Sequence, residues 1–98
     1  MFVMELIHTA PLEAVDAELE AHRAWLDVHF AKGVFLAAGA KRPREGGVVL
    51  AVADDRAHAE EIAAGDPFVT AGVCEYRITE FVAARTAPAL EQYRQPPV

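Results

Sequence analysis

The first predicted helix lies within residues 11–33, PLEAVDAELEAHRAWLDVHFAKG, and the rest of the fold prediction builds on it. Pro11 fits the first position of a helix, where its missing N–H is not needed, and Gly33 is typical of the residue after a helix end. Apolar residues recur at helical spacing between them and fall on one face: Leu12, Val15, Leu19, Leu26 and Phe30. His22 lies within this apolar stripe, and an ionisable residue in such a position needs an explanation.

Apolar, β-prone segments flank this helix in the sequence. They predict strands at residues 2–8, 34–40, 48–53 and 73–83. A second helix is predicted at residues 56–64, since Asp54 or Asp55 can cap its start and Gly65 follows its end. The short polar loop at residues 41–47 favours an antiparallel hairpin between the second and third strands. The resulting β-α-β-β-α-β order predicts an α+β domain with a ferredoxin-like fold and an antiparallel four-stranded sheet.

The first three predicted strands are apolar on both faces. In residues 2–8, for example, Phe2, Met4 and Leu6 point one way, while Val3 and Ile7 point the other. Two helices can cover only one face of a four-stranded sheet, so the second face needs another cover. We therefore predict a homodimer in which the sheets of two copies pack together and form a shared barrel-like core.

The composition limits the function. A chain of 98 residues is one domain, and its formal net charge of −6 argues against nucleic-acid binding, which needs a basic face. No apolar run approaches the roughly 20 residues that span a bilayer, and the N-terminus lacks the features of a signal peptide. The single cysteine, Cys74, cannot form an internal disulfide, which favours the cytoplasm. Because the chain contains no serine, a serine nucleophile is excluded.

The chain resembles the YCII-related (YciI-like) proteins over residues 1–85, which leaves residues 86–98 as a C-terminal tail. Besides the opening strand, the resemblance is carried by HRAWL at 22–26, GVFLAAG at 33–39, GGVVL at 46–50, DPFV at 66–69, AGV at 71–73 and EY at 75–76. The order and spacing of these motifs carry it, rather than any one of them.

This resemblance implies a dimeric α+β barrel, in the wider group of muconolactone isomerase-like and chlorohydroquinone dehydrochlorinase-like enzymes. It also implies that the histidine of the first helix and the aspartate of the Asp-Pro-aromatic turn form the site. These residues are His22 and Asp66 here. The chain departs from the family in one place: many relatives have Ser-Gly-Pro where this chain has Ala38-Gly39-Ala40, so a hydroxyl contact from the second strand is absent.

His22 and Asp66 are therefore the candidate catalytic residues. A carboxylate beside a histidine fixes the ring tautomer and favours proton transfer by the ring. Two structural alternatives stay open: His22 could pair with Glu18 one turn earlier, and Asp66 could serve only as a helix N-cap before Pro67. The candidate substrate-binding residues around the pair are Arg23, His8, Phe68 and Gly72.

No metal or cofactor is predicted, because the chain has no Cys-x-x-Cys, His-x-His or His-Glu-x-x-His spacing. Cys74 is expected to be a small buried hydrophobic residue. Lys41, Arg42 and Arg44 form the one dense basic cluster. A solvent-exposed hairpin is the favoured interpretation of that cluster, and a steering patch for an anionic substrate is the alternative.

Together these features favour a small cofactor-free enzyme of lyase, isomerase or dehydrohalogenase type. His22 would move a proton on a small cyclic or aromatic compound, with Asp66 orienting the ring. The main alternative is a non-catalytic dimeric domain that binds a small ligand or has an accessory role, in which His22 and Asp66 form a structural pair. A monooxygenase on the same kind of barrel is a third hypothesis, for which the sequence carries no haem-specific signal.

Overall fold

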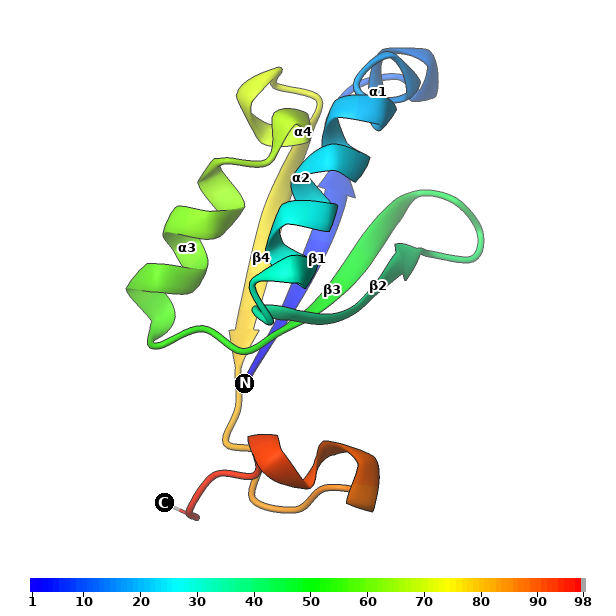
Figure 1. Cartoon of the computed structure of the whole chain (residues 1–98). Helices are drawn as coiled ribbons and strands as arrows, with labels where there is room; N and C mark the ends of the chain where they lie inside the picture. The colour runs from blue at the N-terminus through cyan, green and yellow to red at the C-terminus, as the bar shows by residue number, and fades with distance from the viewer. Residues whose placement is uncertain (98) are drawn as a thin grey trace.

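A computed structural model describes residues 1–97 as an antiparallel sheet with helices on one face (Figure 1). The strands are β1 (Phe2–His8), β2 (Phe35–Ala40), β3 (Gly46–Ala51) and β4 (Cys74–Glu80). They lie in the order β2-β3-β1-β4, and each neighbouring pair is antiparallel. With helices between β1 and β2 and between β3 and β4, this is the ferredoxin-like α+β fold predicted from the sequence.

The first helical segment differs from the prediction of one continuous helix. It is divided into α1 (Leu12–Ala17) and α2 (Leu19–Ala31), because the backbone of Glu18 leaves the helical region at φ −102° and ψ 2°. Gly33 follows α2 with φ +75°, in the left-handed conformation expected of a residue after a helix end. Within residues 1–97 no helix is long and apolar enough to cross a membrane.

The later helices begin at side-chain caps. Asp55 caps α3 (Arg56–Ala64) by accepting a hydrogen bond from the backbone N–H of His58. Asp66 caps the short helix α4 (Pro67–Thr70) in the same way, through the N–H of Phe68. Aspartate is among the best N-cap residues because its side chain satisfies a backbone donor that the helix leaves unpaired.

The predicted strands are correct in place and shifted at their ends. β2 begins one residue later than predicted, β3 two residues earlier, and β4 ends at Glu80 instead of residue 83. The pairing of β2 with β3 is irregular between Phe35 and Ala37. Gly47 allows the two strands to approach closely, since a Cβ added to it would lie 3.1 Å from the Gly39 carbonyl oxygen.

The core lies between the sheet and the helices, in two clusters that β1 joins. Phe2 and Met4 of β1 belong to the first cluster, which contains residues of β2, β3 and α3. Leu6 belongs to the second, together with Val15 of α1 and Phe68 of α4. The three β1 side chains are at most 4% exposed, and burial on this scale contributes roughly 1.5–3 kcal/mol for each large side chain.

Within residues 1–97, no helix covers the other face of the sheet (Figure 1). Val3, Glu5 and Ile7 of β1 lie on this face and are half-buried. The Glu5 carboxylate is 3.2 Å from Lys41 Nζ and 3.7 Å from an Arg77 guanidinium nitrogen. This uncovered face, centred on β1 and β3, is the one for which the sequence predicts a second copy of the chain.

The C-terminal segment folds beside the N-terminus, beyond the start of β1 and the end of β4 (Figure 1). It contains a 3₁₀ helix, η1 (Pro88–Tyr93). Gln95 fastens it: its side-chain oxygen accepts hydrogen bonds from the Met1 ammonium group at 2.9 Å and from the Ala83 N–H at 3.0 Å. The segment therefore lies away from the layer of helices that contains His22.

Gly46 provides a test of the β1–β3 pairing. A Cβ added at this position would lie 2.1 Å from the Leu6 carbonyl oxygen, and the residue has φ +158°. We expect Gly46→Ala to lower the free energy of unfolding by about 1–3 kcal/mol, because the strands would have to separate. Gly39→Ala, which meets no heavy atom within 4 Å, is the control and should change stability by less than about 0.5 kcal/mol. Urea denaturation measures the free energy of unfolding of the two variants. Equal values would contradict the close pairing of β1 with β3 at Gly46.

Candidate active site

The structure brings His22 and Asp66 into direct contact. His22 lies on α2 and Asp66 at the start of α4, and His22 Nδ1 is 2.9 Å and 3.0 Å from the two carboxylate oxygens. Asp66 is completely buried, and His22 is 8% exposed. The structure does not form the alternative pair of His22 with Glu18. Asp66 acts as an N-cap and as the partner of His22 at the same time.

The Asp66 carboxylate accepts hydrogen bonds from three groups. Besides His22, these are the Phe68 backbone N–H at 2.9 Å and the Tyr76 hydroxyl at 2.6 Å. A carboxylate held by three donors can only accept, so the neutral His22 ring carries its proton on Nδ1. The other ring nitrogen, Nε2, then has a free lone pair with which it can take a proton.

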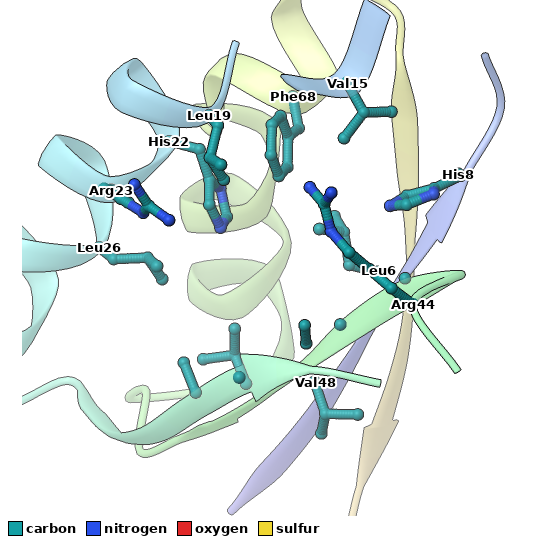
Figure 2. A pocket seen from close by; sticks show the side chains of 16 residues that line it. Leu6, His8, Val15, Leu19, His22, Arg23, Leu26, Arg44, Val48 and Phe68 are labelled. Carbon is teal, nitrogen blue, oxygen red and sulfur yellow. The ribbon is translucent and has the colours of Figure 1, made fainter. Parts of the chain in front are cut away.

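Aromatic side chains hold the His22 ring in place. The Phe68 ring stacks on it, with centroids 4.0 Å apart and planes only 10° from parallel. Trp25 lies on another side at 5.7 Å. Because Asp66 fixes one edge of the ring and Phe68 covers a face, the remaining edge is directed into the cavity (Figure 2).

The cavity beside His22 has a volume of about 370 Å³. It lies between α2 on one side and β2 and β3 on the other, and Phe68 and Val15 close one end (Figure 2). Most of its lining is apolar or small, and the ionisable lining residues are His8, His22, Arg23 and Arg44. A cavity of this size and composition is typical of a site for a small molecule.

The structure places three of the four predicted substrate-binding residues at the cavity. Arg23, His8 and Phe68 line the cavity. Gly72 does not: it lies in the turn before β4 with φ +73°, and its carbonyl oxygen accepts a hydrogen bond from the Thr9 hydroxyl. The structure therefore does not bring Gly72 to the cavity with the other three residues, and its positive φ suits the backbone conformation of this turn.

Tyr76 is a site residue that the sequence alone did not single out. Aromatic residues in strands are most often core, yet the hydroxyl of Tyr76 completes the hydrogen bonding of Asp66. Burial, followed by the negative charge of Asp66, raises the pKa of Tyr76 above its ordinary value. The hydroxyl therefore keeps its proton and donates a hydrogen bond to the carboxylate. The alternation of β4, which places Tyr76 on the same face as Cys74, is the signal that could have indicated this position.

Cys74 is buried behind the site, as expected for a small hydrophobic residue. Burial, with a further contribution from the charge of Asp66, raises the pKa of its thiol to about 11. The thiolate is the nucleophilic form, so a raised pKa makes Cys74 a poor nucleophile near neutral pH.

A second hollow, of about 390 Å³, lies on the other side of Trp25 and is lined by His29 and His58 among others. Burial lowers the pKa of His29, whose Nδ1 has no hydrogen-bond partner within residues 1–97. No group of three or more His, Cys, Asp or Glu in this described range is arranged to hold a metal ion. The carboxylate nearest to its histidines is that of Asp54, 3.6 Å from His58 Nδ1 and 94% exposed, so the cavity beside His22, whose carboxylate partner is buried, is the stronger candidate site.

The fold and the site together define a ferredoxin-like domain with a buried histidine–aspartate pair beside a small cavity. The sequence model of the YCII-related domain matches residues 1–82, and the chain therefore belongs to the YCII-related family. This confirms the resemblance drawn from the motifs.

Among solved structures, the chain is similar in fold to 5-chloro-2-hydroxyhydroquinone dehydrochlorinase from Burkholderia phenoliruptrix, determined in complex with 2,5-dihydroxybenzoquinone. The TM-score is 0.69 with 17% sequence identity, over 83% of this chain and 93% of that one. At this identity the comparison supports the fold. No curated protein sequence matches the chain.

Tyr76→Phe tests the hydrogen bonding of Asp66. Removing the hydroxyl deletes a bond to a buried charge, and we expect the free energy of unfolding to fall by about 1.5–3 kcal/mol. Tyr93→Phe is the matched control, because Tyr93 is half-exposed in η1 and makes no side-chain hydrogen bond within residues 1–97. Chemical denaturation of the two variants should separate them, and equal stabilities would show that the Tyr76 hydroxyl does not support the carboxylate.

Proposed function

We propose that the chain is a small acid/base enzyme, of lyase, isomerase or dehydrohalogenase type, that acts on a small cyclic or aromatic compound without a cofactor. The observation that carries this proposal is the geometry of His22. Its Nδ1 is bound to a fully buried carboxylate, while its opposite edge faces a cavity of about 370 Å³. A ring held in one tautomer with Nε2 free is ready to remove a proton from a bound compound.

The proposed step balances without an added oxidant or metal. His22 Nε2 takes a proton from a carbon or oxygen of the bound ring, and the electron pair left behind forms an enolate or a new double bond. In an elimination, the leaving group departs with its bonding pair. In an isomerisation, the imidazolium returns the proton to another atom of the same compound. Asp66 stabilises the imidazolium in both cases and keeps the ring in place.

The structural neighbour supports this reaction class. Its name describes a dehydrochlorinase, and its bound compound is a small dihydroxylated quinone. Loss of HCl from such a ring requires a base that removes a proton.

Two further features are proposed with the reaction: a cytoplasmic location, since the one cysteine, Cys74, forms no disulfide, and a homodimer.

The test compares His22→Gln with the native protein on chlorinated hydroxyhydroquinones and on lactones of similar size. Gln cannot exchange protons, so we expect kcat/KM to fall by about 10²–10⁴-fold, as for the loss of a general acid/base. His29→Gln, on the same helix and outside this cavity, is the control and should retain full activity. Equal turnover by native protein and His22→Gln would contradict the assignment of His22.

A structural role for the pair is the competing function, because Asp66 also links α2, α4 and β4 through its three hydrogen bonds. Asp66→Asn distinguishes the two. The Asn amide can still form hydrogen bonds, but it can donate to Nδ1 and so place the ring proton on Nε2. An active site predicts lost turnover in a folded variant, whereas a purely structural pair in a binding module predicts unchanged ligand affinity and a lower melting temperature alone.

The proposed homodimer uses the uncovered face of the sheet. Val3 and Leu50 are directly paired there across β1 and β3, and Val48 is 39% exposed beside Glu5. Packing against a second copy would remove this apolar surface from water, as between the sheets of a sandwich.

We expect light scattering at micromolar concentration to give the mass of two chains for the native protein and of one chain for Leu50→Glu, because a charge buried at this interface has no partner. Leu12→Glu is the control, since Leu12 is a large hydrophobic residue, 45% exposed, on α1 of the opposite layer. A native protein that scatters as a single chain would overturn the dimer.

A further inference from the structure

We propose that Arg23 and Arg44 form an anion-binding subsite at the mouth of the His22 cavity, and that the compound bound there carries an ionised oxygen on its ring, as an enolate, phenolate or carboxylate. The inference rests on the proposed function only in taking this cavity as the substrate site. It adds the charge of the compound and the two residues that recognise it.

The ionisable side chains that line the cavity are basic, although the chain as a whole is acidic. The chain has a formal net charge of −6, yet within residues 1–97 no aspartate or glutamate lines the cavity. The four ionisable side chains of the lining are two arginines and two histidines, contributed by β1, α2 and the loop between β2 and β3. A concave site with only basic groups in an acidic protein attracts an anion and repels a cation.

The second observation concerns Arg44. Its guanidinium reaches from the β2–β3 loop to the Asp16 carboxylate on α1, across the cavity (Figure 2). The hydrogen bond from Arg44 lowers the pKa of Asp16 and raises that of Arg44. Only one guanidinium nitrogen bonds to Asp16, so other N–H donors of the planar group remain for a ligand. Asp16 therefore holds the guanidinium over the cavity without lining the cavity itself.

The third observation concerns Arg23, which follows His22 on α2. Within residues 1–97 its guanidinium forms no ion pair and no side-chain hydrogen bond, although it lines the cavity from the helix side (Figure 2). Arg56, by contrast, bonds to both the Glu60 carboxylate and the Ile78 carbonyl oxygen. An arginine with free donors at a cavity can bind a carboxylate or phenolate oxygen through two N–H groups.

The two guanidinium groups would stabilise the negative charge that the proposed reaction creates on the bound compound. Removal of a proton from a ring leaves negative charge on its oxygen atoms, and a nearby guanidinium stabilises that charge. The same groups favour a compound that is already ionised before it reacts. The subsite thus links recognition of the compound to the step performed by His22.

The test is calorimetric titration at neutral pH with two probes, 2,5-dihydroxybenzoquinone, whose acidic hydroxyls are ionised, and its neutral dimethyl ether. We expect the native protein to bind the anion at least about tenfold more tightly than the ether, and added salt to weaken only the anion. Arg23→Gln and Arg44→Gln should each reduce this preference, and the double variant should abolish it. The ratio of the two affinities is insensitive to general damage to the fold, because the probes have the same ring.

Arg42→Gln is the matched control, since Arg42 belongs to the same loop and does not line the cavity. His22→Gln should keep the preference for the anion even where it loses turnover, which separates this proposal from that of the reaction. Undetectable binding of the anion by native protein, equal affinity for both probes, or a preference that survives in the double variant would each overturn the subsite. If the preference is present and no turnover is found, the subsite stands and the proposed reaction fails.

Discussion

The structure depends on the Asp66 carboxylate, a charged group that is completely excluded from water. Burial of an unpaired charge is prohibitively unfavourable, so such a group has to be satisfied by the surrounding protein. Here the donors come from three elements: His22 of α2, the Phe68 backbone of α4 and Tyr76 of β4. One side chain therefore fastens two helices to the sheet and fixes which nitrogen of His22 carries the proton.

Groups of opposite charge lie at the two edges of the His22 ring. The negative charge of Asp66 lies behind it, where it stabilises the ring when the ring gains a proton. On the cavity side lie the guanidinium groups of Arg23 and Arg44, which in our proposal stabilise the charge left on the bound compound. Proton transfer from compound to His22 creates a positive and a negative charge, and each would form beside an opposite charge already in place.

Much of this arrangement could be predicted from the sequence. Local patterns predicted the order of strands and helices, and the polar His22 in an apolar stripe marked the site, while the family motifs indicated Asp66. The break at Glu18 could not be predicted, because no glycine or proline marks it. Tyr76 and Arg44 were underestimated for another reason: their partners, Asp66 and Asp16, are set by the packing of β4 and by a loop that crosses to α1, contacts that no local pattern encodes.

Asp66 holds the neutral His22 ring with its proton on Nδ1 and leaves Nε2 free. Long-range ¹H–¹⁵N correlation NMR on the ¹⁵N-labelled protein, above the pH at which the ring is protonated, measures this directly. We expect one tautomer for His22, with Nδ1 protonated and Nε2 unprotonated. A ring that carries its proton on Nε2, or that exchanges between both tautomers as a free histidine does, would contradict it.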